Sequence, residues 1–198
     1  MKTGLALGLA ATIALSQPAM ADNDEKKDMP QETMGFVEWV VLQDTGLRMK
    51  ARLDTGAKTS SLHAVNVEPF KKGDDEWVSF QIPLADHQDM DEVEVEGVKK
   101  PESVVLEFER PVERTVLIKR KGAPSQRRYV VRMEFCIGGS THETQFSLTD
   151  RGRFSYPTLL GRRFLEDDNI LVGSSDSFLA EKKCEYNELP EIVEKNED

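Results

Sequence analysis

The sequence has few of the residues that build metal sites or disulfide frameworks, with two cysteines and three histidines among 198 residues. His63, His87 and His142 show no paired spacing on a helix, so we expect no metal site. No glycine-rich loop of the kind that cradles nucleotide phosphates occurs, and we expect no cofactor. Two cysteines allow one intramolecular bridge. The spacing leaves open whether Cys136 and Cys184 pair or stay as buried thiols.

Positive charge is also scarce. Lys and Arg number 26 against 36 Asp and Glu, which gives a formal charge of −10. This balance argues against general nucleic-acid binding, because such binding needs a basic face. No apolar run long enough to cross a membrane follows the first 21 positions, so no membrane span is expected in the mature chain. Hydrophobic residues, at 38%, suffice for one core.

The first 21 residues have the layout of a secretory signal. Lys2 gives a positive start, an apolar stretch runs from Gly4 to Leu15, and Ala19-Met20-Ala21 is a small-residue cleavage site. We therefore predict a signal peptide over residues 1–21 and an exported chain, located in the bacterial periplasm. A buried N-terminal helix and a membrane anchor are the less favoured alternatives, and the apolar run is short for an anchor. Residues 22–34 are polar and lack periodicity, which predicts a flexible leader.

Short apolar runs separated by turn residues predict an all-β domain over residues 35–184, either a barrel or a sandwich. No long stretch has helical periodicity, and residues 158–165 contain at most one helical turn. The acidic segment 85–97 is expected to be an exposed loop or edge strand, and residues 185–198 an acidic tail. The predicted strands are residues 36–42, 47–53, 77–84, 104–108, 115–119, 129–137, 144–148 and 169–172.

One segment carries the clearest chemical signal. A predicted strand ends in Leu53 and delivers Asp54, and Gly56 then permits a tight turn. The result is a carboxylate on a close-packed loop. The same tripeptide, Asp-Thr-Gly, also occurs at residues 44–46. There it lies in a predicted hairpin turn, and we interpret it as a turn only.

A second segment, Tyr156 to Leu165, has two apolar residues and a glycine followed by a basic residue. In combination with the Asp54 loop, the sequence resembles the retropepsin-like aspartic proteases, and within them the bacterial branch often labelled ATP-dependent zinc proteases. The matching stretches are residues 52–62, 127–131 and 148–164. The resemblance implies an all-β closed barrel with one short helix after the Leu-Leu-Gly segment.

The resemblance also implies roles for individual residues. Asp54 matches the catalytic aspartate. Lys58 departs from the retroviral pattern, which has an acid there to pair with the basic residue matched by Arg162. The remaining matches are the active-site loop (Thr55, Gly56, Ala57), the segment that supports it (Leu159, Leu160, Gly161, Arg162) and the flap tip (Lys121, Gly122, Ala123, Pro124).

Peptide hydrolysis by this chemistry needs two adjacent carboxylates that share one proton. The chain has one qualifying loop, so the second carboxylate would come from Asp54 of another copy. The resemblance therefore predicts an aspartic endopeptidase that acts as a homodimer on a peptide or protein substrate. The alternative is a non-catalytic peptide-binding module on the same barrel, in which an extended peptide lies beneath the flap.

Overall fold

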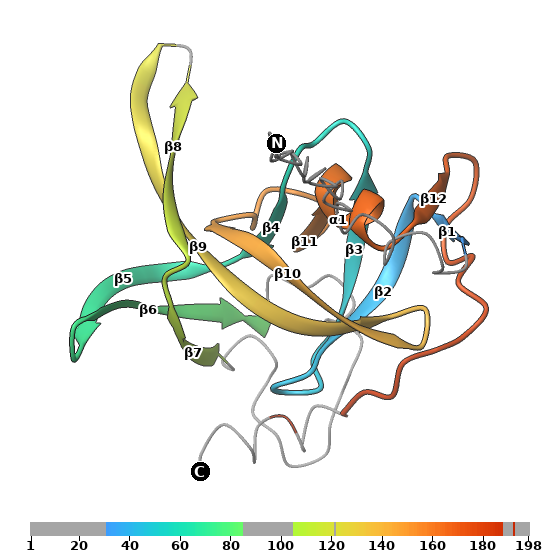
Figure 1. Cartoon of the computed structure of the whole chain (residues 1–198), viewed down its shortest axis with the longest axis horizontal. Coiled ribbons are helices and arrows are strands. Elements are labelled where there is room, and N and C mark those ends of the chain that lie inside the picture. Colours follow the sequence, from blue (N-terminus) through green and yellow to red (C-terminus); the bar gives the residue numbers. More distant parts are fainter. Residues whose placement is uncertain (1–30, 85–104, 121, 188–191, 193–198) are drawn as a thin grey trace, which may run out of the picture.

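The computed structural model describes residues 31–84, 105–120, 122–187 and 192, and within them it is an all-β protein with one short helix (Figure 1). The predicted fold class is thus confirmed at this level. The elements in chain order are β1 Glu32–Gly35, β2 Val37–Leu42, β3 Arg48–Asp54, β4 Ser60–His63, β5 Val65–Lys72, β6 Asp75–Pro83, β7 Val105–Pro111, β8 Arg114–Arg120, β9 Ala123–Ile137, β10 Ser140–Thr149, β11 Thr158–Gly161, α1 Arg162–Asp167 and β12 Ile170–Gly173.

Seven of the strands form the main sheet, in the order β10-β4-β11-β3-β2-β9-β8, and β10 also pairs with β9. Two of its contacts are parallel: β4 with β10, and β3 with β11. A three-stranded sheet, β5-β6-β7, lies to one side, and β1 pairs with β12 in a two-stranded sheet. The parallel contact of β3 with β11 brings the two segments singled out in the sequence side by side.

Alternation of apolar and charged residues explains why β3 forms. Met49, Ala51 and Leu53 are buried in the core, while Arg52 is exposed on the other face. The antiparallel partner of β3 is β2, as the predicted hairpin requires, and Gly46 takes a positive φ of 72° in the turn. The core continues into a cluster of aromatic rings from three elements, Phe135, Phe146 and Phe164.

The strands β8 and β9 form a long hairpin that projects from the body of the molecule (Figure 1). This is the hairpin predicted as a flap. Gly122 lies at its turn with a φ of 75°, and the backbone of Ala123 pairs with that of Arg120. Pro124 follows on β9. Lys121 lies outside the described residues.

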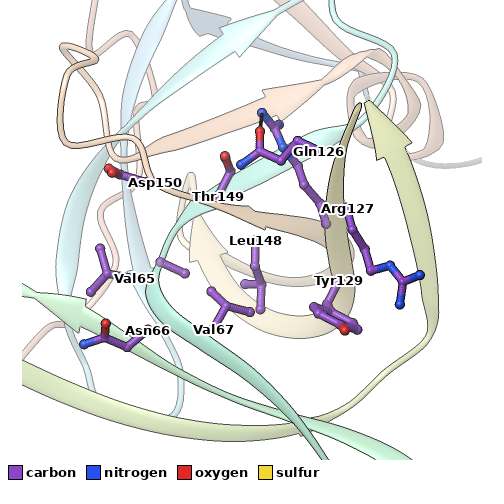
Figure 2. Close-up of a pocket in the computed structure, with 11 residues that line it drawn as sticks. Val65, Asn66, Val67, Gln126, Arg127, Tyr129, Leu148, Thr149 and Asp150 are labelled. Carbon is purple, nitrogen blue, oxygen red and sulfur yellow. Dashed lines mark hydrogen bonds between the residues drawn. The ribbon is translucent and has the colours of Figure 1, made fainter. Parts of the chain in front are cut away.

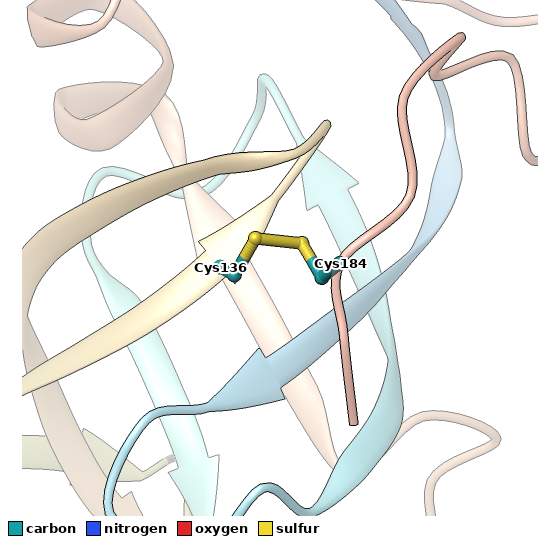
Figure 3. Close-up of a disulfide and its surroundings, with 2 residues drawn as sticks. All are labelled: Cys136 and Cys184. Atoms are coloured by element: carbon teal, nitrogen blue, oxygen red, sulfur yellow. A yellow bond between two sulfur atoms is a disulfide. The ribbon is translucent and has the colours of Figure 1, made fainter.

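The two cysteines are joined in a disulfide, with their Cα atoms 5.9 Å apart (Figure 3). Cys136 lies near the end of β9, and Cys184 lies in the segment after β12. The bridge therefore attaches the C-terminal segment to the main sheet. The spacing had left open whether the two cysteines pair or stay as buried thiols, and in the structure they pair.

Several boundaries differ from the sequence-based expectation. The flexible leader expected over residues 22–34 ends earlier, because Glu32–Gly35 forms β1 against β12. Within the expected acidic tail, residues 185–198, the backbone N–H of Asn187 donates to the carbonyl of Gly46 and Ile192 is buried in the core. The strands β4 and β5 were not predicted. The signal peptide and the acidic segment 85–97 lie outside the described residues.

No helix in the described part of the chain has the length and apolar character needed to cross a membrane.

Candidate active site

Asp54 is the last residue of β3 and lies in register with Gly161, the last residue of β11. Its Oδ1 accepts hydrogen bonds from the backbone N–H groups of Gly56, at 2.9 Å, and Ala57, at 3.2 Å. Oδ2 accepts no hydrogen bond from the described residues. One oxygen of the carboxylate is thus fixed by its own loop, and the other is available to a ligand.

The segment predicted to support this loop does lie directly against it. Gly161 donates its N–H to the hydroxyl of Ser60, and Arg162 donates its N–H to the carbonyl of Ala57, at 2.8 Å. A Cβ on Gly161 would come within 2.5 Å of the backbone of Thr59. Only glycine fits this close approach, so the Leu-Leu-Gly pattern has a steric cause. Leu160 is buried beneath it, and Leu159 is half-buried.

The outer part of the loop faces solvent. Thr55 and Gly56 are exposed, and so are Lys58 and Arg162. No carboxylate in the described ranges lies within ion-pair distance of Lys58 or Arg162. The ion pair known from the retroviral pattern is therefore not replaced by a local one, and two unneutralised cations flank the Asp54 loop.

A third cation, Arg151, is buried next to this site, with 8% of its surface exposed. Its Nη1 donates to the hydroxyl of Ser61 at 2.9 Å and its Nε to the carbonyl of Tyr156 at 3.0 Å. Burial lowers the pKa of Arg151, and the positive charge of Arg128 lowers it further, while the negative charge of Asp54 raises it. The guanidinium thus lies within electrostatic reach of Asp54 but is held by neutral acceptors.

His63 fixes the backbone at Arg151. Its Nδ1 accepts the N–H of Arg151 at 2.8 Å, and its side chain is almost fully buried at the end of β4. An Nδ1 that accepts a hydrogen bond is unprotonated, so the geometry corresponds to a neutral imidazole. His63, nine residues after Asp54 in the sequence, therefore has a structural role beside the site.

A pocket of about 300 Å³ opens next to Arg151, between β5, β9 and the end of β10 (Figure 2). In Figure 2, Leu148, Val67 and Tyr129 gather on one side of the pocket, and Asp150 and Arg127 lie on opposite sides. Arg128, which lowers the pKa of Arg151, also lines it. The pocket lies beside the β8–β9 hairpin, through residues 126–129 of β9.

The sequence did not single out Arg151 or Arg128 as functional residues, although both stand in stretches that match the family. A signal was present in the polar turn Asp150-Arg151-Gly152, which directly follows a strand. Arg151 is buried because Ser61 and Tyr156 reach it from elements far apart in the sequence. Sequence reasoning could not supply those contacts.

Among the residues that the structure describes, no three His, Cys, Asp or Glu side chains gather as metal ligands. His63 is engaged by Arg151, and Nδ1 of His142 lies 2.8 Å from a carboxylate oxygen of Asp168. His87 lies outside the described residues.

Residues 33–183 match the model of a family described as RimB-like, retropepsin-like aspartic endopeptidase RimB. The chain belongs to this family. The match includes the Asp54 loop, the hairpin and the Leu-Leu-Gly segment, as the resemblance found in the sequence predicted. A crystal structure of the protein Lpg0085 of unknown function from Legionella pneumophila is similar, with a TM-score of 0.61 and 30% identity, covering 77% of this chain and all of that one.

Curated relatives of this family member have a different name. A probable alpha-L-glutamate ligase from Shewanella pealeana is 34% identical over 151 residues, which are 76% of this chain and 30% of the relative. A probable alpha-L-glutamate ligase from Desulfotalea psychrophila is 31% identical over 146 residues, 73% of this chain and 29% of the relative. The chain thus spans about 30% of the length of these relatives.

These names correct the function expected from the sequence. We predicted an aspartic endopeptidase that hydrolyses peptides between two Asp54 carboxylates of a homodimer, or else a non-catalytic peptide-binding module. The relatives are named as ligases of L-glutamate, which contradicts that prediction. The resemblance identified the family, whereas the reaction and the substrate do not follow from the Asp54 loop alone.

Proposed function

We propose that this chain is an enzyme of α-L-glutamyl chain metabolism, which binds a glutamate-rich chain next to the Asp54 loop and acts at an α-glutamyl bond. Two comparisons support the proposal. The family description names an endopeptidase, and the curated relatives are named as alpha-L-glutamate ligases. Both descriptions name an enzyme that acts on a peptide-like bond, and the description of the relatives specifies glutamate.

The observation that carries the proposal is the environment of Arg151. A buried charge is costly unless an opposite charge or strong hydrogen bonds compensate it. The described residues offer Arg151 a hydroxyl at Ser61, a carbonyl oxygen at Tyr156 and the ring of Phe154, 4.7 Å from its guanidinium carbon, and no carboxylate of theirs lies within ion-pair distance. A glutamate side chain of a substrate would supply the missing negative charge in a charge-assisted hydrogen bond.

Further cations near Asp54 and in the pocket would also favour the binding of carboxylates. Lys58 and Arg162 flank the Asp54 loop, and Arg127 and Arg128 line the pocket beside the hairpin. This concentration of positive charge stands out on a chain with a formal charge of −10. Such a local positive field attracts acidic ligands and speeds their encounter. A chain of glutamates offers one carboxylate per residue to match it.

In this proposal Asp54 is the acid–base group of an aspartic-type enzyme. The backbone N–H groups of Gly56 and Ala57 hold its Oδ1, so the carboxylate has a fixed orientation. A fixed carboxylate can exchange a proton with a group bound at its other oxygen, Oδ2. Arg151 would act as a positioning residue, because it binds a substrate side chain rather than the reacting bond.

We further propose that the main sheet is the closed barrel of the retropepsin-like fold. The pairing of β10 with β9 supports this, because it links two strands that lie at opposite ends of the sheet order apart from β8. The homodimer, the peptide or protein substrate and the export to the periplasm stay predictions. The disulfide fits an oxidising compartment, where such bridges persist.

Two synthetic peptides, which differ in the charge of their side chains, test the substrate class. The purified protein is incubated with an octamer of α-linked L-glutamate or of L-glutamine, once without nucleotide and once with ATP and free glutamate. Mass spectrometry reads the chain length. We expect the glutamate chain to change length in one of the two conditions, and the glutamine chain to react at least about tenfold more slowly. Equal rates on both chains, or no change in either condition, would contradict the proposal.

A further inference from the structure

A second pocket, of about 330 Å³, lies away from the Asp54 loop between β2 and the C-terminal segment. We call residues 178–187 the C-terminal strap and this cavity the strap pocket. The lining includes Trp39 and Val41 of β2, Arg48 of β3, and Phe178 and Tyr186 of the strap. The mechanism proposed above uses none of these residues.

The strap is fixed at three places along its length. Near its start, Oε1 of Glu38 accepts the backbone N–H groups of Leu179, at 2.7 Å, and Ala180, at 3.1 Å. Further on, the disulfide joins Cys184 to β9 (Figure 3). At its end, the side chain of Asn187 donates to the carbonyl of Thr45. A wall held at three points gives a pocket that exists before a ligand binds, which reduces the entropy lost on binding.

Arg48 is held between two aromatic rings. Its guanidinium carbon lies 4.5 Å from the ring centroid of Trp39 and 3.9 Å from that of Tyr186. Trp39 also stacks on Phe178, with ring centroids 5.4 Å apart and planes 21° apart. Stacking covers the faces of a guanidinium and leaves its N–H groups, which lie at the edge, as donors. No hydrogen-bond acceptor for them is present among the described residues.

The charges that line the pocket are mostly positive. Lys182 and Lys183 join Arg48, and none of the three has a carboxylate within ion-pair distance in the described ranges. Among the described residues that line the pocket, Glu38 is the one acid, and it is 97% buried. Its Oε1 is already occupied by three backbone N–H groups, of Gly35, Leu179 and Ala180. The pocket therefore favours an anion.

We propose that the strap pocket is a binding site for a small planar carboxylate, one with an aromatic or similarly flat apolar body. The carboxylate would bind the edge of the Arg48 guanidinium in the bidentate manner that this group favours. The flat body would pack against Phe178, which is 44% exposed. This inference does not depend on the proposed function at Asp54, because the two sites share no residue.

The same contacts would also be found if Arg48 served only to fasten Tyr186 to β3. The two explanations differ in whether the pocket takes an anion, so 2-naphthoate is a suitable probe and its uncharged amide, 2-naphthamide, is the matched control. The chain has two tryptophans, Trp39 and Trp77. In a ¹⁵N-labelled sample the variant W77F assigns the two indole N–H signals, and only Trp39 lines the pocket.

We expect 2-naphthoate to shift the Trp39 indole signal in a saturable way, with a dissociation constant below about 1 mM for a ligand of this size. The amide should bind at least about tenfold more weakly, and R48Q should weaken naphthoate binding by a similar factor. No saturable shift of Trp39, or equal binding of acid and amide, would overturn the proposal.

R48Q removes a contact to Tyr186 and could loosen the strap, so a second variant keeps the test decisive. K182Q/K183Q alters only exposed side chains and leaves the Arg48 stack intact; we expect about two- to fivefold weaker naphthoate binding. K71Q removes one positive charge from β5, outside the pocket, and should leave naphthoate binding unchanged. The double variant C136S/C184S, like K182Q/K183Q, should bind naphthoate more weakly, because it releases the strap that forms one wall of the pocket. If K71Q weakens binding as much as K182Q/K183Q, the site is not specific and the proposal fails.

Discussion

Nη1 of Arg151 donates a hydrogen bond to the hydroxyl of Ser61 at 2.9 Å, across 90 residues of sequence. Ser61 stands on β4, directly after the Asp54 loop, so this bond fixes a buried cation at a constant position relative to that loop. Neutral partners hold the guanidinium in place without neutralising it. In the proposed function, a carboxylate of the substrate supplies the opposite charge, and this arrangement would discriminate in favour of acidic chains.

Replacing Arg151 by Gln is expected to remove most of the preference for acidic substrates. Without the guanidinium, a bound carboxylate loses its charge-assisted partner, so KM for an oligo-α-L-glutamate chain should rise at least about tenfold with a smaller change in kcat. R151K keeps the charge and should restore part of the affinity. Steady-state kinetics on the octamer measures both effects.

Arg132 provides the matched control. It is a half-exposed arginine on β9 that already pairs with Glu113 at 3.2 Å and Glu143 at 3.1 Å. R132Q should therefore leave KM within about twofold, since exposed ion pairs contribute little. A rise in KM as large as that of R151Q would show that overall charge, and not the position of Arg151, sets the preference.

The sequence predicted the strands with clear patterns and missed those whose stability comes from distant partners. Alternation identified β3, and turn residues identified its hairpin with β2. In contrast, β1 pairs only with β12, far away in the sequence. The strand β5 contains a proline and an asparagine with positive φ, which hide its pattern.

For the candidate site too, some residues were predicted from the sequence and others were missed. The family resemblance placed Asp54 and Gly161 together, and their strands do pair in register. Arg151 could not be placed, because its burial depends on Ser61 and Tyr156 together. The names of the curated relatives contradict the predicted function, because an Asp-Thr-Gly loop by itself contains no information on the substrate.

Gly161→Ala should destabilise the fold, because the new Cβ would meet three backbone atoms of Thr59 at 2.5–2.9 Å. Backbone cannot move aside as a side chain can, so we expect a loss of about 1–3 kcal/mol in the free energy of unfolding. Urea denaturation followed by circular dichroism measures it. Gly56→Ala is the comparison, since its Cβ would meet only Oδ1 of Asp54, at 3.2 Å. It should cost under about 1 kcal/mol; equal losses would contradict the steric role of Gly161.

Glu38→Ala should also be strongly destabilising. It removes the acceptor of three backbone N–H groups, those of Gly35, Leu179 and Ala180, and leaves buried donors unsatisfied. We expect a loss of about 2–4 kcal/mol in the free energy of unfolding. E38Q retains one acceptor oxygen and should lose less. E68A, at an exposed position on β5, should stay within about 0.5 kcal/mol of the wild type. A value for E38A that matches E68A would contradict this account of the strap.

The pair of Glu113 and Arg132 should make a small, acid-sensitive contribution to stability. The hydrogen bond from Arg132 holds the pKa of Glu113 below its ordinary value of 4.5. A carboxyl group whose pKa is lowered in the folded state stabilises that state above its ordinary pKa. This contribution is lost as the pH falls through the lowered value. NMR titration of the Glu113 carboxyl carbon should show a higher pKa in R132Q than in the wild type. An unchanged pKa would contradict the assigned cause.

The most direct test of the central claim is the chain length of an α-L-glutamate octamer after incubation with wild type and with D54N, read by mass spectrometry in the presence and absence of ATP and glutamate. Asn is nearly isosteric with Asp and can still accept the N–H groups of Gly56 and Ala57, so the fold and the binding of the octamer should persist. The account predicts that wild type changes the chain length in one of these conditions and that D54N, although it still binds the octamer, does not. A D54N protein that changes the chain length as fast as wild type would contradict it.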